Sequence, residues 1–354
     1  MHKLLRSLGL ARRFSRLPRR RTERPFSGLE SLEHRALMNA SSPWSEAPRL
    51  ERDANTGPAL RAAWTRPGSA SLGTKSLSNV AYATRNGQSM RLDVYLPRGQ
   101  APAGGWPVIL AIHGGGWRKF SKDQYGPKVA PALLSQGFAV VAPNYSLASP
   151  GRPSWPFAMD DLRGSVRWIR ENSARYKLDG DRIAAMGESA GGHLAALLGS
   201  APDDLATKGI SSKVQAVVSF YGPTDLTSMV VDNTSGGWAV QQFVGSHPGF
   251  NPRRYQDASP LDQVTADDAP MMLIHGTADS IVPTVQSIDM DRALKAVGIP
   301  SKLVVLPGAQ HGFGFTVNGR ALLPEIIAFL KSSFVFQKER AQRVDEPVVE
   351  VGGE

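Results

Sequence analysis

The chain has 354 residues, of which 41% are hydrophobic and 20% charged, enough to bury the core of one large domain. It contains no cysteine, which excludes a disulfide framework, thiolate-bound zinc, iron–sulfur clusters and a cysteine nucleophile. The formal net charge is +10, but the first 75 residues hold 15 basic side chains against 6 acidic ones, so the remainder is nearly neutral. No nucleic-acid partner is therefore expected for the main domain, because phosphate binding needs a basic folded surface. No apolar stretch approaches the eighteen or so residues of a spanning helix, so no membrane span is expected.

The first 75 residues mix arginine with Ser, Pro, Gly and Ala and show no lasting apolar periodicity. We expect this basic segment to be disordered or cleaved. A standard secretory signal is not expected, because Arg6, Ser7 and Gly9 interrupt the early leucines. Residues Leu32-Glu33-His34-Arg35-Ala36-Leu37 resemble a short element found near the start of many planctomycete exported and surface proteins. That resemblance favours an exported or cell-envelope protein; a piece of low-complexity tail, in a cytoplasmic protein, is the alternative.

A folded domain is predicted over residues 76–337. The alternation of apolar and polar residues on both sides of Asn86-Gly87 predicts a β-hairpin with a tight turn. Apolar runs of strand length follow at Val108–Ile112, Phe138–Ala142, Ile183–Met186, Val214–Phe220, Met271–Ile274 and Leu303–Leu306. Between these runs, apolar residues recur at helical spacing, as in Met159, Leu162, Val166 and Ile169.

This alternation of strands and helices predicts an α/β fold with a mostly parallel central sheet and helices on both faces. Reactive groups in such sheets lie beyond the carboxyl ends of the strands. A last helix, with Pro324 near its start, is expected to close the domain near residue 337. Residues 338–354 would then form a charged C-terminal tail.

The strongest local signal is Gly187-Glu188-Ser189-Ala190-Gly191-Gly192, between a predicted strand and a predicted helix. A serine with glycines two positions before and after it in this setting is typical of a nucleophile elbow. The glycines are needed because a Cβ atom there would collide with the neighbouring strand or helix, and the turn presents the hydroxyl above the sheet. A plain glycine-rich turn or a phosphate cradle at the helix start is the alternative.

A second glycine-rich segment, His113-Gly114-Gly115-Gly116-Trp117, directly follows a predicted buried strand. Negative charge develops on an ester carbonyl oxygen during attack, and N–H groups of this loop and of Ala190 can receive it. We expect His113 to brace the loop through hydrogen bonds and Trp117 to pack rather than react. A flexible loop without function is the alternative.

A serine nucleophile needs a base, and His311 has the right setting, in a glycine-rich loop after the last predicted strand. A loop of this kind can aim the imidazole back over the sheet. His193 and His275 are interpreted as core residues, and a structural role remains the alternative for His311.

The imidazolium must be oriented and stabilised by a carboxylate. Asp225 and Asp279 both follow predicted strands, and both fit the chain order serine, acid, histidine. Asp279 is preferred, because one helix and one strand separate it from His311, so that the two loops leave adjacent strands. Asp225 is interpreted as a helix cap or loop brace, and Asp160 and Asp161 as first-turn acids favoured by the helix dipole.

Val108–Trp117, Pro156–Gly192 and Pro270–Phe313 together resemble an α/β-hydrolase of the esterase/lipase superfamily. The sequence is most similar to the group of feruloyl and acetylxylan esterases (BD-FAE), and it is close to hormone-sensitive-lipase-like esterases. The resemblance covers about residues 77–337. It implies the α/β-hydrolase fold, with roles at the matching positions of nucleophile for Ser189, acid for Asp279, base for His311 and oxyanion donors for Gly115, Gly116 and Ala190.

Two features depart from the resemblance. In Asn144-Tyr145-Ser146-Leu147, relatives usually have arginine after the tyrosine, so we expect a structural ion pair to be missing here. The short N-terminal part gives no sign of the helical cap of hormone-sensitive-lipase-like enzymes.

We therefore predict a serine carboxylic-ester hydrolase that uses an acyl-enzyme and needs no metal or organic cofactor. Its expected substrate is a short-chain or carbohydrate-linked (acetyl or feruloyl) ester, on a small molecule or a polysaccharide. The loop region between Asp225 and Ala269 is expected to determine substrate specificity. Trp238, Phe243 and Phe250 are expected to form the pocket walls, together with Trp117. A monomer or weak homodimer is expected.

Three alternatives remain at this stage. A peptidase of the prolyl-oligopeptidase type would need a propeller of several hundred residues, which is absent from this sequence. An arylformamidase would have the same triad and a different pocket. A non-catalytic binding module of the same fold is disfavoured by the intact serine, acid and histidine.

Overall fold

The computed structural model describes residues 75–85, 87–203 and 209–345. The expectations for residues 1–74, including the Leu32–Leu37 element and the export inferred from it, lie outside the described residues, as do residues 346–354. The expected start of the folded domain at residue 76 falls within the first strand, which begins at Lys75.

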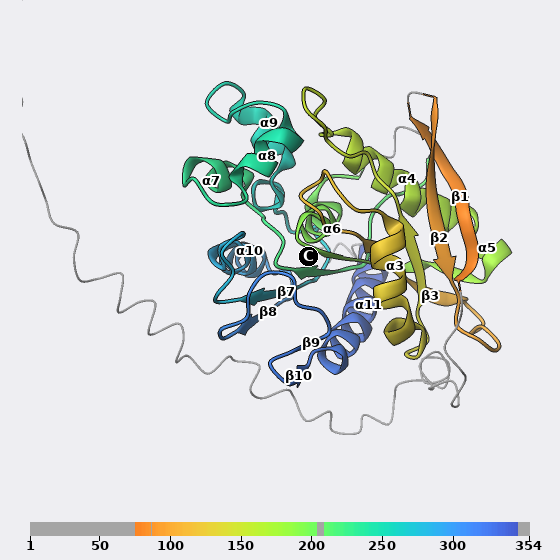
Figure 1. Ribbon diagram of the computed structural model, residues 1–354. Helices are drawn as coiled ribbons and strands as arrows, with labels where there is room; N and C mark the ends of the chain where they lie inside the picture. The colour runs from red at the N-terminus through yellow and green to blue at the C-terminus, as the bar shows by residue number, and fades with distance from the viewer. Residues whose placement is uncertain (1–74, 86, 204–208, 346–354) are drawn as a thin grey trace, which may run out of the picture. The chain divides into compact units, whose positions relative to one another are not determined.

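The described domain is built on eight strands that form one sheet (Figure 1). They are β1 Lys75–Arg85, β2 Gln88–Tyr95, β3 Trp106–Ile112, β4 Ala139–Pro143, β5 Leu178–Glu188, β6 Ala216–Phe220, β7 Met271–Gly276 and β8 Ser301–Leu306. The order in the sheet is β1-β2-β4-β3-β5-β6-β7-β8, with β1, β2 and β4 paired antiparallel and β4 to β8 paired parallel. The predicted α/β fold with a mostly parallel sheet is confirmed. A short hairpin, β9 Thr316–Val317 and β10 Arg320–Ala321, follows β8.

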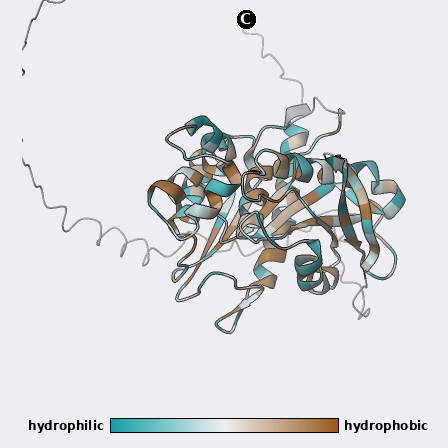
Figure 2. Ribbon diagram, turned by 45° about the horizontal axis from the view of Figure 1, so that its top comes forward, coloured by the Kyte–Doolittle hydropathy of each residue, from teal (hydrophilic) through white to brown (hydrophobic). Residues whose placement is uncertain are grey.

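Helices cover both faces of the sheet. They are α3 Lys122–Leu134, α4 Phe157–Glu171, α5 Ser173–Tyr176, α6 Ala190–Ser200, α7 Leu226–Val231, α8 Gly237–Val244, α9 Pro252–Ala258, α10 Val285–Ala296 and α11 Leu323–Asp345, with a 3-10 turn η2 at Pro260–Gln263. Side chains of β3 alternate between two cores: Leu110 belongs to the one that includes residues of α4, α6 and α10, and Ile109 to the one that includes residues of α3 and α11. Strands buried on both faces are expected to be apolar throughout, and Figure 2 shows much of the sheet in the brown of hydrophobic residues.

Two segments differ from the expectations. The last helix, α11, continues to Asp345 instead of ending near residue 337, because polar side chains of its extra turns hold it to the loop before β7. Arg340 binds Oδ1 of Asp267 at 2.5 Å, and Gln337 reaches the carbonyl oxygen of Asp268 at 3.5 Å. The region between Asp225 and Ala269, expected as loop, contains α7, α8, α9 and η2.

The expected loss of an ion pair after Tyr145 is also corrected. The buried carboxylate of Asp161, in α4, accepts hydrogen bonds from the backbone N–H and the hydroxyl of Ser146, at 2.9 and 2.5 Å. Arg85, from the end of β1, supplies the missing positive charge, with Nη2 at 2.9 Å and Nε at 3.0 Å from Oδ1 of Asp161. Arg85, distant in sequence, thus pairs with the carboxylate that binds Ser146, and Asp161 is more than a first-turn acid.

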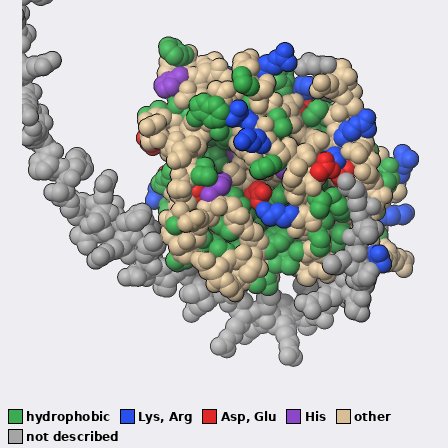
Figure 3. Space-filling view, viewed as in Figure 1, with side chains coloured by type: hydrophobic (Ala, Val, Ile, Leu, Met, Phe, Trp, Pro, Cys, Tyr) green, Lys and Arg blue, Asp and Glu red, His purple; other side chains and the backbone are tan. Residues whose placement is uncertain are grey.

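The described part of the chain contains no helix with the length and apolar character that a bilayer crossing requires. Within the same residues, no group of three or more His, Asp or Glu side chains is placed to hold a metal ion. On the face shown in Figure 3, Lys and Arg side chains are dispersed among neutral groups and form no continuous basic field.

Candidate active site

Ser189 occupies the sharp turn between β5 and α6, with a backbone φ of 54° and ψ of −121°. Residues with a Cβ atom avoid this conformation, so the surroundings must enforce it. The N–H of Ser189 donates to the carbonyl oxygen of Phe220 at 2.9 Å. A Cβ atom on Gly187 would lie 2.3 Å from the backbone of Gly191, and one on Gly191 would lie 2.2 Å from the carbonyl oxygen of Ile112. Both glycines are required by backbone contacts, for the steric reason expected from the sequence.

The side chains of Ser189, His311 and Asp279 form one hydrogen-bonded row. Nε2 of His311 lies 2.9 Å from Oγ of Ser189, and Nδ1 of His311 lies 2.7 Å from Oδ2 of Asp279. The three residues follow the carboxyl ends of β5, β7 and β8, on the same edge of the sheet. The structure does not place Asp225 in this row: its carboxylate caps α7 by accepting from the N–H groups of Thr227 and Ser228.

The side chain of Asp279 is fully buried, and its two carboxylate oxygens have different partners. Oδ1 accepts from the N–H groups of Ile281 and Val282, both at 2.9 Å. Oδ2 faces His311 and, at 3.3 Å, also Nε2 of His275. Burial alone would raise the pKa of Asp279, but hydrogen bonds from His275, His311 and Val282 outweigh it and hold the pKa well below its usual range. The group therefore stays ionised at neutral pH.

The role of His275 was missed by the sequence interpretation. The residue is fully buried, as expected, but its Nε2 faces both the carbonyl oxygen of Val282, at 2.9 Å, and the carboxylate of Asp279. Its Nδ1 lies 2.7 Å from the hydroxyl of Ser287 in α10. The available signal was the spacing: His275 is the last residue but one of β7 and stands four residues before Asp279.

Tyr221 is a second residue that the sequence interpretation missed. Its ring packs against that of His311, with centroids 4.5 Å apart. Its hydroxyl donates to the carbonyl oxygen of Phe313 at 2.8 Å and lies 3.2 Å from Oε2 of Glu188. Burial raises the pKa of Tyr221, so the hydroxyl remains a donor. Tyr221 thereby links the residue before Ser189 to the loop that holds His311; no motif marked it.

The oxyanion loop, His113–Trp117, lies beside Ser189. A Cβ atom on Gly114 would be 3.5 Å from Cβ of Ser189, so the loop passes directly next to the serine. Gly115 and Gly116 have φ values of +100° and +59°, and among the described residues no backbone carbonyl accepts their N–H groups. Ala190 is the first residue of α6, where backbone N–H groups have no acceptor within the helix. These three N–H groups therefore have no backbone acceptor in the described part of the chain.

His113 braces the oxyanion loop as expected. Its ring stacks on Tyr145 with centroids 4.3 Å apart, its Nδ1 lies 2.9 Å from the carbonyl oxygen of Gly114, and Tyr145 donates its hydroxyl to the carbonyl oxygen of His113. Burial lowers the pKa of His113 to about 4, despite the opposing effect of the hydrogen bond to Gly114. The imidazole is therefore neutral near pH 7.

Of the four aromatic residues predicted as pocket walls, two are buried and two are exposed. Trp117 is 3% exposed and Phe243 is fully buried, and their rings stack on each other with centroids 4.7 Å apart. Nε1 of Trp117 donates to Nδ1 of the buried His193 at 3.2 Å. The prediction that Trp117 and Phe243 form open pocket walls is therefore wrong. The two rings pack α8 against the oxyanion loop, because stacking removes more of their apolar surface from water than an open position would.

Trp238, one residue before Ala239 in α8, does lie at the surface, with 58% of its area exposed. The guanidinium of Arg118 covers its ring at 4.2 Å. Cβ of Ala239 is 3.4 Å from the Cβ position of Gly116, so Trp238 stands close to the oxyanion loop. Phe250 is 89% exposed, and no described contact joins it to the site other than the ring of His247.

A serine elbow, a buried acid and a histidine at the carboxyl ends of parallel strands define the class of α/β-hydrolases. The model of the BD-FAE family matches residues 92–294, more than half of the chain. The chain belongs to the BD-FAE family, and its described domain is an α/β-hydrolase of the esterase type.

Individual relatives agree with this placement. Esterase LipQ of Mycobacterium tuberculosis is 33% identical over 261 residues, which cover 72% of this chain and 61% of LipQ. A truncated carbohydrate esterase from gut microbiota matches with a TM-score of 0.65 and 26% identity, over 77% of this chain and 100% of that one. The esterase Est2 of the planctomycete Thermogutta terrifontis, with propionate bound, matches with a TM-score of 0.58 and 25% identity, over 76% and 94% of the two chains. The chain thus spans about three fifths of the length of LipQ.

Proposed function

We propose that the protein hydrolyses carboxylic esters through an acyl-enzyme, with Ser189 as nucleophile, His311 as base and Asp279 as acid. The observation that carries this proposal is the hydrogen-bonded row of the three side chains, with contacts of 2.9 and 2.7 Å. Nδ1 of His311 donates to the ionised Asp279, which leaves Nε2 as the acceptor that faces the serine hydroxyl.

In the first step, Oγ of Ser189 attacks the ester carbonyl carbon while Nε2 of His311 takes the hydroxyl proton. The carbonyl oxygen becomes an oxyanion, and the N–H groups of Gly115, Gly116 and Ala190 supply hydrogen bonds to it. Collapse of this intermediate breaks the bond to the alcohol oxygen, which receives the proton from His311. Water then repeats the sequence on the acyl-enzyme and releases the carboxylic acid, restoring the serine.

Short-chain or carbohydrate-linked acyl esters are the proposed substrate class. This is supported by the described surroundings of the serine, where Trp117 and Phe243 fill the space under the oxyanion loop instead of leaving a deep acyl channel between them. It is also supported by relatives whose names state a carbohydrate esterase and a propionate complex. Trp238 remains 58% exposed although Arg118 stacks on its ring, and exposed aromatic surface of this kind packs against a sugar or an aromatic group.

The test compares the parent protein with Ser189→Ala and with a matched control, Ser332→Ala, whose hydroxyl is bonded within α11. We expect hydrolysis of 4-nitrophenyl acetate to fall by about 10⁴-fold or more in Ser189→Ala and to stay unchanged in the control. A fluorophosphonate probe should label the parent and the control but not Ser189→Ala. Hydrolysis at the parent rate by Ser189→Ala would rule out the mechanism. Acetylated xylan, a feruloyl ester and N-formylkynurenine, assayed side by side, separate the ester classes from the amide alternative.

A further inference from the structure

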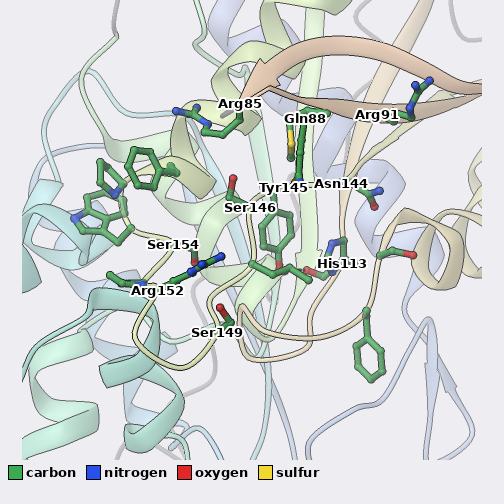
Figure 4. A pocket seen from close by; sticks show the side chains of 18 of the residues that line it. Arg85, Gln88, Arg91, His113, Asn144, Tyr145, Ser146, Ser149, Arg152 and Ser154 are labelled. Atoms are coloured by element: carbon green, nitrogen blue, oxygen red, sulfur yellow. Dashed lines mark hydrogen bonds between the residues drawn. The ribbon is translucent and has the colours of Figure 1, made fainter.

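A cleft of about 850 Å³ opens beside the oxyanion loop, between the turn of the β1–β2 hairpin and the loop that follows β4 (Figure 4). This volume lies within the range of sites for small ligands. We call it the arginine cleft, because Arg85, Arg91, Arg152 and Arg254 line it and no Asp or Glu does. The proposed function does not use it.

The arginine cleft adjoins the candidate active site through the oxyanion loop. His113, the first residue of that loop, lines the cleft, and the next residue, Gly114, passes beside Ser189. Phe120, also in the lining, would meet a Cβ atom on Gly115 at 2.8 Å and is 57% exposed. The cleft lining does not include Ser189, so a substrate with its ester at Ser189 would have to pass over Phe120 to reach the cleft.

The charges of the four arginines are unequally compensated. Arg85 is paired with the buried carboxylate of Asp161. Arg254 is held by carbonyl oxygens, those of Val244 at 2.6 Å and of Trp155, which fix the guanidinium without neutralising it. Arg91 likewise donates to the carbonyl oxygen of Asn79. Among the described residues no carboxylate pairs with Arg91, Arg152 or Arg254, and Arg152 is exposed at the rim.

A buried hydroxyl adds a second, independent observation. Ser154 lines the cleft, is 2% exposed, and its Oγ has no hydrogen-bond partner among the described residues. Leaving a buried hydroxyl unpaired is unfavourable, so such groups generally have a hydrogen-bond partner in the functional state. A fixed guanidinium, a free guanidinium and an unpaired hydroxyl together suit an anion with several acceptor oxygens.

We propose that the arginine cleft binds a carboxylate or sulfate group carried by the ester substrate, so that the protein acts on acylated acidic carbohydrates in preference to neutral ones. This inference rests on the proposed function for the position of the ester at Ser189, and on the cleft alone for the anion. Neutral acyl esters would leave three unpaired cations and the Ser154 hydroxyl without a role.

The binding test uses Ser189→Ala protein, so that nothing is hydrolysed, and calorimetry with three probes: trigalacturonate, a sulfated chondroitin disaccharide and neutral xylotriose. We expect at least one anionic probe to bind at least tenfold more tightly than xylotriose, and its affinity to fall as NaCl rises from 20 to 300 mM because salt screens exposed charges. The two anionic probes distinguish carboxylate from sulfate. Equal affinity for all three probes would overturn the proposal.

Variants assign the binding to the cleft. Arg152→Gln, added to Ser189→Ala, should lower the affinity for the anionic probe by about tenfold. That is the effect expected from the loss of one charge-assisted hydrogen bond. Arg98→Gln is the matched control, because it removes the same charge from an exposed residue outside the cleft. Equal loss in both variants would show only a general charge effect and would overturn the assignment.

Turnover separates this proposal from the proposed function. With serine restored, Arg152→Gln should raise KM for an acetylated galacturonate about tenfold more than it raises KM for 4-nitrophenyl acetate, which carries no anionic group for the cleft. If the parent hydrolyses 4-nitrophenyl acetate through Ser189 but Arg152→Gln leaves the acidic substrate unaffected, the cleft proposal alone fails. If Ser189→Ala keeps the parent rate, the proposed function fails whatever the cleft binds.

Discussion

Nε2 of His275 lies 3.3 Å from Oδ2 of Asp279, the same oxygen that accepts the hydrogen bond of His311 at 2.7 Å. The carboxylate is therefore held from two sides by imidazoles, one buried and one at the site. Because Ser287 and Val282 fix the orientation of the buried ring, His275 can set the direction in which Asp279 presents its oxygen to His311. We therefore expect His275 to act through Asp279, as a positioning residue.

We expect His275→Phe to lower kcat for 4-nitrophenyl acetate by on the order of tenfold, the cost of one hydrogen bond to a charged group, with little change in KM. The reason is that Asp279 matters most when His311 becomes charged, after substrate has bound. His275→Gln, which keeps a donor, should recover part of the loss. Steady-state kinetics and melting temperatures of both variants check this. A parallel fall in stability and kcat, with no recovery in His275→Gln, would reduce His275 to a packing residue.

Asp279→Asn tests the choice between the two aspartates. The amide oxygen of asparagine can still accept from Ile281 and Val282, so the fold should survive, but kcat should fall by about 10⁴-fold because the charge that supports the imidazolium is gone. Asp225→Ala should instead cost about 1 kcal/mol of unfolding free energy, as the loss of a helix cap does, and keep kcat. Kinetics and urea unfolding of both variants distinguish the two aspartates. A large loss of kcat in Asp225→Ala, with kcat kept in Asp279→Asn, would make Asp225 the acid.

The glycine two residues after the serine gives a steric prediction. A Cβ atom on Gly191 would lie 2.2 Å from a backbone oxygen that cannot move away, so Gly191→Ala should lose more than about 3 kcal/mol of stability, together with activity. Gly164→Ala is the control: it lies inside α4 and its Cβ would meet nothing closer than 3.7 Å. That variant should gain up to about 1 kcal/mol from helix propensity. Unfolding curves for both proteins check this, and a Gly191→Ala protein with the parent's stability would contradict the close approach.

Two buried histidines predict loss of stability in mild acid. Burial lowers the pKa of His113 and of His193 to about 4 in the folded protein, against about 6.5 for an exposed histidine. Between these values the unfolded chain binds more protons, so stability is fully present above about pH 6.5 and is lost as the pH falls toward 4. The loss is at most about 3 kcal/mol per histidine.

Urea unfolding at pH 7 and pH 5 measures this effect. His193→Gln should reduce the difference between the two pH values, whereas His247→Gln, at an exposed position, should not. A parent protein equally stable at both pH values would show that these imidazoles take up protons without cost. Below about pH 4, Asp279 adds a loss of the same sign: its folded pKa lies below the unfolded one, so the stability it contributes disappears as it becomes protonated.

The part of the site that sequence could predict is the part in which local geometry demands particular residues. Ser189 was identifiable because a backbone at φ 54° needs glycines at positions 187 and 191, where any Cβ would strike the main chain. His311 and Asp279 were identifiable because parallel strands put their carboxyl ends on one edge. The apolar runs predicted the sheet for the same reason, since strands buried on both faces must be apolar.

Only the tertiary structure decided the contacts between residues that are distant in the chain. For such contacts, local sequence patterns do not select one partner among many. Arg85 pairs with Asp161, 76 residues further along the chain, because the hairpin and α4 meet in space. Trp117 and Phe243 have the character of pocket walls in sequence, yet they stack on each other, because burial depends on which surfaces the fold brings together. The arginine cleft likewise combines side chains from four separate segments. The distribution of charges along the sequence does not predict that these segments lie side by side in the fold.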